Sequence, residues 1–220
     1  MNDAEENRVT IDKGDAGEEP DFQPLDRFNA FSDGVFAIVI TLLVLELPVP
    51  PANEPVLPLI TESWAEFLGY FISFAFIGGI WLSHTRLTKS MKWGDSVSFR
   101  LNLVVLLFVS LIPFTTKLMV THMTGSDARA VVTIYGLNLF AESLILASLM
   151  AYVARDRYLV VDDIADDRIR QAFRQRRVYL VLVALAIIVG LMAPLVAVGT
   201  YVVLTVAFII QPLISARRTH

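Results

Sequence analysis

The chain has 220 residues, no cysteine, and a formal net charge of −4 at pH 7. Hydrophobic residues make up 55% of it and charged residues only 18%, with a mean hydropathy of +0.59, whereas an ordinary soluble domain is about 45–50% apolar and about 25% charged. These values exclude a soluble enzyme, a disordered chain and a secreted disulfide scaffold, and the acidic balance argues against a nucleic-acid partner. A membrane protein with several spans and lipid around it is the class that remains.

Residues 1–26 form a polar segment that holds nine Asp and Glu residues against two basic residues, Arg8 and Lys13. A segment of this composition buries too little apolar surface to fold alone. We therefore predict a disordered acidic cytoplasmic tail, with the alternative that its carboxylates concentrate cations near a pore mouth. The apolar run that follows has no small-residue cleavage site, so we expect a retained helix rather than a signal peptide.

Six apolar runs are long enough to cross a bilayer, whose hydrocarbon core of about 30 Å needs roughly 20 residues of helix. They are apolar without interruption, which favours helices over the alternating strands of a membrane barrel. In chain order the predicted spans are Phe28–Leu47, Trp64–Leu82, Phe99–Val120, Ala130–Val153, Val178–Ala193 and Leu195–Leu213, the last two forming a hairpin near Pro194. The expected fold is an all-α membrane domain over residues 27–215, followed by a short basic cytoplasmic tail at residues 216–220.

The distribution of basic residues predicts the orientation of these spans, because Lys and Arg are enriched on the cytoplasmic side of a membrane. With six spans, all of the 18 Lys and Arg residues except Lys117 and Arg129 fall on the same side as the two termini. Five or seven spans would mix the two sides. Both termini are therefore expected in the cytoplasm.

Polar residues inside the predicted spans are informative, because each is costly in hydrocarbon and normally faces protein or water. Asp33, His84 and Asn102 come at about the same cytoplasmic level of the first three spans, and we predict that they share hydrogen bonds. Asn138 and Glu142 are one turn apart in the fourth span. That pair has two interpretations, a polar contact inside the bundle or a relay for protons or cations.

In the first span, Ile38, Thr41, Leu42 and Leu45 follow the i, i+3, i+4, i+7 spacing that places residues on one stripe of a helix. At 100° per residue, Asp33 points roughly 140° away from Ile38. Periodicity alone favours ordinary helix packing for the stripe. For Asp33 it favours a structural pairing with a neighbouring helix.

Motifs of common enzymes and of common ion filters are absent from the sequence. There is no Walker A loop, no G-x-G-x-x-G and no G-x-S-x-G, and the three histidines have no metal-ligand spacing. The T-V-G-Y-G loop, whose carbonyls replace the hydration shell of potassium in ordinary potassium channels, is missing too. We therefore predict neither an enzyme nor a bound metal or other cofactor.

The segment RFNAFSDGVFAI at residues 27–38 and its continuation TLLVLEL at residues 41–47 resemble the first helix of the transmembrane protein 175 family of potassium channels. The Phe-Ser-Asp triplet behind an Arg is the signature of that family. The resemblance extends to IGGIWLSH at residues 77–84, to Asn102 and to Pro113–Phe114, and it covers roughly residues 25–215. A single unit of six helices is similar to the prokaryotic members.

This resemblance implies a homotetramer whose first helices line a central pore, with potassium as the permeant ion and modest selectivity over sodium. It implies apolar constrictions at Ile38, Leu42 and Leu45, with a layer of hydroxyl groups at Thr41. It also implies a structural polar network that holds the pore helix, with the members Arg27, Phe31, Ser32, Asp33, His84 and Asn102. The expected location is the plasma membrane of a prokaryote.

The rival hypothesis is a secondary transporter that couples a cation to protons through Asp33, His84 and Glu142. Such transporters often carry inverted repeats and helices that are broken near the centre of the membrane. The sequence shows no clear internal repeat, and Gly78–Gly79 is a weak candidate for a break.

Overall fold

The computed structural model describes the backbone of residues 23–155, 159–160 and 166–217, and the side chains within these ranges except those of residues 166–172 and 208–217. Residues 1–22 of the predicted acidic tail therefore lie outside the described residues. Of the basic tail predicted for residues 216–220, only the backbone of residues 216 and 217 is described, as part of the last helix.

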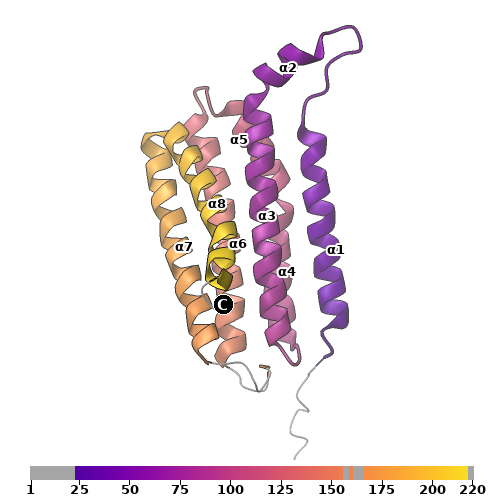
Figure 1. Cartoon of the computed structure of the whole chain (residues 1–220), viewed down its shortest axis with the longest axis vertical. Helices are drawn as coiled ribbons and strands as arrows, with labels where there is room; N and C mark the ends of the chain where they lie inside the picture. The colour runs from indigo at the N-terminus through magenta and orange to yellow at the C-terminus, as the bar shows by residue number, and fades with distance from the viewer. Residues whose placement is uncertain (1–22, 156–158, 161–165, 218–220) are drawn as a thin grey trace, which may run out of the picture.

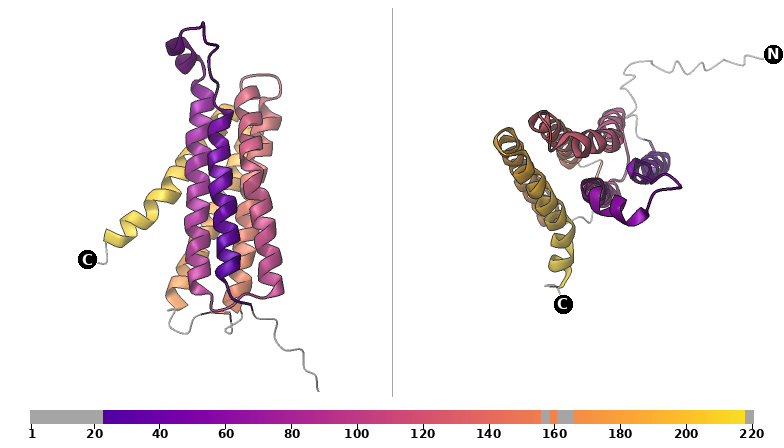
Figure 2. Two further views of the ribbon diagram at one scale, coloured as in Figure 1. Left: turned by 90° about the vertical axis from the view of Figure 1, so that its right-hand side faces the viewer. Right: turned by 90° about the horizontal axis from the view of Figure 1, so that it is seen from above.

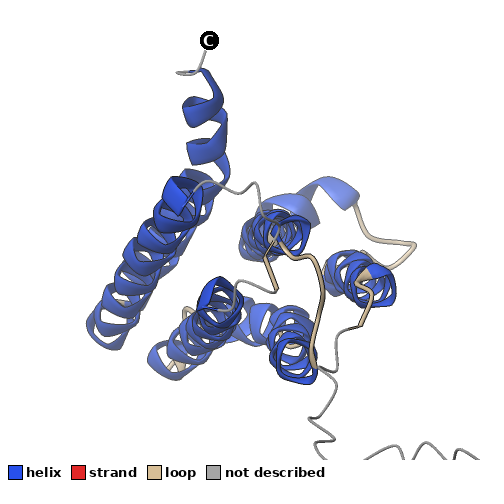
Figure 3. Cartoon of the chain, turned by 90° about the horizontal axis from the view of Figure 1, so that it is seen from below, coloured by secondary structure: helices blue, strands red, loops and turns tan. Residues whose placement is uncertain are grey.

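The described part of the chain is all-helical, with two isolated β-bridges, Gln23–Gly94 and Met91–Val160, and no strand (Figure 3). Figure 1 shows the elements as an upright bundle. In order they are α1 (Asp26–Leu42), the 3-10 turn η1 (Leu43–Glu46), α2 (Val56–Glu62), α3 (Trp64–Ser90), α4 (Ser96–Ser110), α5 (Ile112–His122), α6 (Ala128–Arg155), α7 (Asp166–Met192) and α8 (Pro194–Arg217).

Five segments in the described part of the chain are long and apolar enough to cross a membrane. They are Asp26–Glu46, Trp64–Ser90, Ser96–His122, Ala128–Arg155 and Phe173–Met192. They coincide with the first five predicted spans, so the prediction of an all-α integral membrane protein is confirmed. The apolar part of α8 with described side chains, Pro194–Ala207, is shorter than a full span, and the sixth span stays a prediction.

Two helix boundaries differ from the prediction for identifiable reasons. The predicted span Phe99–Val120 is two helices, because Pro113 has no N–H to donate and its ring disfavours the preceding turn, which places a break at Leu111 between α4 and α5. α7 begins at Asp166, twelve residues before the predicted Val178. Hydropathy detects the apolar part of α7 and misses the charged residues that precede it in the same helix.

α6 lies at the centre of the packing and contacts α4, α5, α7 and α8. α1 packs against α3, α4 and α5 and stands at the edge of the bundle opposite α7 and α8 (Figures 1 and 2). α8 returns antiparallel to α7, and its C-terminal end points away from the bundle (Figure 2). The arrangement leaves α1 covered on one side only.

The start of α4 is fixed by a capping box at Asp95. The Asp95 carboxylate accepts a hydrogen bond of 3.0 Å from the Ser98 N–H, and the Ser98 hydroxyl accepts one of 2.9 Å from the Asp95 N–H. The Tyr152 hydroxyl of α6 also donates to this carboxylate. α4 is therefore tied to the central helix at one end, which holds its side chains in register with those of α1 and α3.

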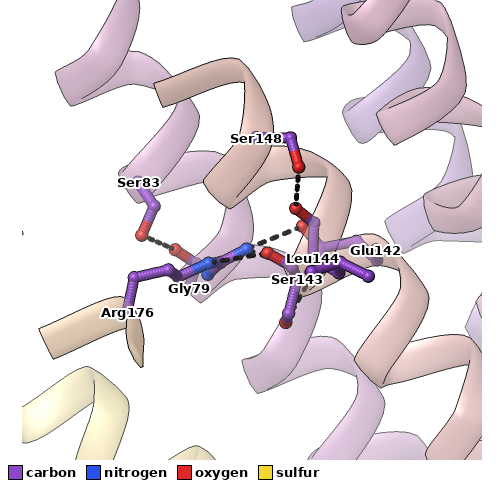
Figure 4. Close-up of polar contacts among 7 residues, drawn as sticks. All are labelled: Gly79, Ser83, Glu142, Ser143, Leu144, Ser148 and Arg176. Atoms are coloured by element: carbon purple, nitrogen blue, oxygen red, sulfur yellow. Dashed lines mark hydrogen bonds and ion pairs between the residues drawn. The ribbon is translucent and has the colours of Figure 1, made fainter. Parts of the chain in front are cut away.

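A buried ion pair joins α6 to α7. The Arg176 guanidinium lies 3.2 Å from Glu142 Oε1 and donates to the main-chain oxygen of Ser143 at 3.2 Å, while the Ser143 hydroxyl donates to Glu142 Oε2 at 3.0 Å (Figure 4). The Glu142 side chain is 0% exposed and that of Arg176 5% exposed. The predicted spans left Arg176 in the loop between the fourth and the fifth span. That placement was wrong, because α7 extends through Arg176.

Asn138, one turn away, contributes no bond to this pair. Its amide nitrogen donates to the Thr115 hydroxyl at 3.3 Å, and its oxygen has no partner among the described residues. Of the two interpretations of Asn138 and Glu142, the bonds of both residues favour contacts that hold helices together.

Replacement of Glu142 by Ala is expected to destabilise the protein strongly, by about 3–5 kcal/mol, because it leaves the Arg176 charge buried without a partner. The midpoint of thermal unfolding in detergent should fall by roughly 10 °C. The control is Glu142→Met combined with Arg176→Met, which removes both charges and should restore most of the loss. A single variant as stable as the wild type would contradict the structural role of the pair.

Candidate functional site

α1 has one face that is buried against the rest of the chain. Its buried residues are Phe28, Ser32, Phe36, Val39 and, in η1, Leu43. They are spaced by four or three positions, as expected for one stripe of a helix. These residues pack toward α3 and α4, so the rotation of α1 about its own axis is determined by this face.

The predicted pore stripe lies on the opposite, open face of α1. Ile38 is 61% exposed, Leu42 42% and Leu45 75%, and Thr41 is exposed as well. The described residues leave most of the Ile38 and Leu45 side chains uncovered and cover Leu42 in part. The Thr41 hydroxyl donates to the main-chain oxygen of Ile38 at 2.7 Å, so the lone pairs of its oxygen remain available to a cation or to water.

A buried polar cluster holds the N-terminal half of α1 against α3 and α4. The Asn102 amide nitrogen donates to the Ser32 hydroxyl at 2.9 Å, and the Asn102 oxygen accepts from His84 Nε2 at 2.7 Å. The Ser32 hydroxyl in turn donates to the main-chain oxygen of Phe28 at 2.9 Å. All three side chains are at most 2% exposed. One residue of α4 thus connects α1 to α3.

Aromatic rings enclose this cluster. The Phe28 ring stacks on the His84 imidazole with ring centres 5.9 Å apart, and the Phe36 ring lies 5.6 Å from it at a tilt. Both rings come from α1, and the His84 side chain is 1% exposed, so its hydrogen bond to Asn102 is shielded from water. The hydrogen bonds are correspondingly strong and costly to leave unmade.

Asp33 lies outside the cluster. Of the predicted triad, the hydrogen bond between His84 and Asn102 is confirmed, but the participation of Asp33 is wrong. The Asp33 carboxylate accepts a hydrogen bond of 2.8 Å from Trp81 Nε1 of α3 instead, and Ser32 takes its place beside Asn102. The reason is helical geometry, since neighbouring residues are turned by 100°. A pairing of Asp33 with a neighbouring helix, the interpretation favoured by the sequence, agrees with this bond.

The other two members of the predicted network lie on the open side of α1. Arg27 is exposed, and the Phe31 side chain is 56% exposed. Within the described residues neither packs into the cluster of Ser32, Asn102 and His84. Any network that includes them needs atoms other than those of the described residues.

The sequence did not predict the partners of three polar residues. Trp81 donates to Asp33, and Arg176 pairs with Glu142. The ammonium group of Lys117 donates to the main-chain oxygen of Glu46 at 2.9 Å. Their partners lie on other helices, where residue spacing carries no signal.

The described residues contain no group of three or more His, Asp and Glu side chains that are placed to hold a metal ion. In the stripe of Ile38, Thr41, Leu42 and Leu45, the one polar side chain is that of Thr41, with a single hydroxyl oxygen. Such a surface suits transient contact with a hydrated cation better than tight coordination.

A family model described as "Endosomal/lysosomal potassium channel TMEM175" matches residues 27–113. This region contains every residue of the predicted pore stripe and of the predicted polar network. A potassium channel of Streptomyces collinus is 33% identical over 136 residues, which cover 60% of this chain and 66% of that protein. A potassium channel of Chamaesiphon minutus is 33% identical over 147 residues, which cover 64% of this chain and 72% of that protein.

The fold agrees with a solved structure. The crystal structure of a lysosomal potassium-selective channel TMEM175 homolog from Chamaesiphon minutus matches with a TM-score of 0.76 at 28% sequence identity. The match covers 84% of this chain and 96% of that chain, so nearly the whole of that channel subunit has a counterpart here.

Asn102→Ala is expected to lower stability by about 2–4 kcal/mol, because it leaves the buried His84 Nε2 without its acceptor and removes the donor to the Ser32 hydroxyl, which keeps only its bond to Phe28. In a protein of this size the unfolding midpoint should drop by roughly 5–10 °C. The measurement is thermal unfolding in detergent, followed by size-exclusion chromatography. Asp33→Asn serves as the comparison, since its amide oxygen still accepts from Trp81 and a small change is expected. Equal losses in the two variants would refute the central position of Asn102.

Proposed function

The chain belongs to the TMEM175 family of potassium channels, and from this premise we propose that it conducts potassium through a pore lined by the open face of α1. One observation carries the proposal: Ile38, Thr41, Leu42 and Leu45 share one side of a spanning helix that stands at the edge of the bundle. A stripe that mixes aliphatic side chains with an available hydroxyl oxygen suits a water-filled path that can close.

A path for ions needs walls on all sides, and one copy of α1 supplies only one wall. We propose a homotetramer in which four open faces surround a common axis. Arg27 and Phe31 lie on the open side of α1 near its inner end, where a neighbouring copy would cover them. This arrangement supplies the missing partners of the predicted polar network.

The proposed gate acts by dewetting. Four aliphatic side chains around a narrow axis exclude water, and an ion stripped of its water meets a large barrier. Conduction requires the α1 helices to twist or splay until hydrated ions pass. Potassium holds its water less tightly than sodium, and the Thr41 oxygens replace part of the lost water, so the channel favours potassium modestly.

The proposed topology has six spans with α8 as the sixth, and both ends of the chain in the cytoplasm of a prokaryotic cell. Exposed basic residues gather at the end of the bundle where α1 begins and α3 and α4 meet: Arg27, Arg86, Lys89, Lys92 and Arg100. That distribution follows the enrichment of Lys and Arg on the cytoplasmic face of a membrane. The membrane is then the plasma membrane.

The rival hypothesis of a proton-coupled transporter depended on Asp33, His84 and Glu142 acting together. Each of the three is bound to a different partner, namely Trp81, Asn102 and Arg176. No described contact connects them in series, and no observation favours this function over a channel.

Ile38→Asn is expected to raise the single-channel conductance or the open probability severalfold, because an amide side chain lets water into the constriction. The measurement uses purified protein in planar bilayers with potassium on both sides. Leu185→Asn is the control, since Leu185 is 51% exposed on α7 at the opposite edge of the bundle and should leave the current unchanged. A current that falls in Ile38→Asn alone would argue against the constriction.

Thr41→Val is expected to reduce the preference for potassium severalfold, since it keeps the shape of the side chain and removes the hydroxyl oxygen. The reversal potential in a potassium–sodium gradient should move toward zero. Thr41→Ser keeps the hydroxyl and should keep most of the preference. Identical reversal potentials in the valine variant and the wild type would rule out a role of Thr41 in selectivity.

A further inference from the structure

The outer end of the first helix is a 3-10 turn whose terminal carbonyl is held from another helix. η1 covers Leu43–Glu46 and ends where Leu47 becomes extended, because a residue before a proline, here Pro48, disfavours the helical region. The last carbonyls of a helix have no partner within it. The carbonyl of Glu46 finds its partner in Lys117 of α5.

Two contacts of Lys117 differ in quality. Its ammonium nitrogen lies 2.9 Å from the main-chain oxygen of Glu46 but 3.8 Å from the nearer carboxylate oxygen of the same residue. The two side chains are 44% and 41% exposed, so the ion pair is loose and screened and contributes little. The bond to the carbonyl is of hydrogen-bond length, and it places a cation at the negative end of a helix dipole.

The residue directly before Glu46 is Leu45, the most exposed residue of the pore stripe at 75%. It shares the η1 turn with the carbonyl that Lys117 binds. We propose that Lys117 is a positioning residue of the channel: by holding the Glu46 carbonyl it fixes the η1 turn and sets the direction of Leu45. The part of this proposal that concerns the gate rests on the proposed function; the part that concerns the turn does not.

The bond of Lys117 to Glu46 lies at the opposite end of the first span from the other polar contacts of α1. The N-terminal half of α1 is held by the cluster of Ser32, Asn102 and His84, and by Asp33 on Trp81. Between that half and η1, the buried residues are the apolar Phe36 and Val39, whose side chains form no hydrogen bond. Lys117 therefore controls the outer end separately from the inner one.

A thiol-labelling experiment tests the turn without any current. The chain contains no cysteine, so Leu45→Cys creates a single reactive site. A membrane-impermeant thiol reagent is applied from outside, and the labelling rate is compared with the rates after adding Lys117→Met or Lys117→Arg. We expect Lys117→Met to change the rate at least severalfold and Lys117→Arg, which keeps donors and charge, to stay near the reference. Equal rates in all three would overturn the proposal.

The carbonyl contact and the ion pair are separated by Glu46→Ala in the same labelled background. This variant removes the carboxylate and leaves the main-chain oxygen that Lys117 binds. We expect a labelling rate close to the reference. A change as large as that of Lys117→Met would assign the effect to the ion pair and overturn the role of the main chain. Lys117→Gln replaces Lys117→Met if the latter does not assemble by size-exclusion chromatography.

Recordings in planar bilayers with potassium on both sides then test the gate. In Lys117→Met we expect the ratio of open to closed time to rise about tenfold, equivalent to about 1.4 kcal/mol, with Lys117→Arg and Glu46→Ala near the wild type. Altered labelling with unaltered gating would overturn the link to Leu45. A wild-type protein that passes no current would refute the proposed function, while the labelling result would still decide the role of Lys117 in the turn.

Discussion

The side chain of Asn102 is the interaction on which the rest of the arrangement depends. Its amide uses both ends, one on Ser32 of α1 and one on His84 of α3. In hydrocarbon a polar group without a partner is costly, so these three helices have one rotation in which all three groups are satisfied. That rotation turns Phe36 and Val39 inward and leaves Ile38 outward. A polar contact on one side of a helix thus selects the aliphatic surface on the other.

Hydropathy located the spans, and the family resemblance carried by the first helix was confirmed, because both depend on short stretches of sequence. The spacing i, i+3, i+4 and i+7 also predicted that the stripe residues share a face, but periodicity alone favoured ordinary packing for that face and did not give its exposure. The exchange of Asp33 for Ser32 was not predictable from depth alone, because depth does not give the angle at which two helices face each other. Depth is shared by all the residues of one turn.

The partners of Arg176 and Lys117 were hidden for a different reason. Arg176 follows a run of charged residues that reads as a loop, and only its pairing with Glu142 shows that α7 continues through it. Lys117 donates to a main-chain oxygen, an acceptor that every residue possesses and that leaves no trace in the sequence. Pro113 signals the break at Leu111, but the predicted span followed the continuous apolar run through it.

The pair of Glu142 and Arg176 also has a consequence for biosynthesis. An arginine at the centre of an isolated membrane helix costs about 2.5–3.5 kcal/mol at the insertion machinery, whereas one near a helix end can extend toward the interface. Arg176 lies near the start of the apolar segment Phe173–Met192, so it adds a smaller cost. Glu142 precedes Arg176 in the chain, so α6 is already available when α7 emerges from the ribosome. The acid then serves as a docking point that lowers the cost of inserting the base, and the order of synthesis matches the order in which the two charges neutralise each other. The charged partner of α7 thus belongs to a helix made before it.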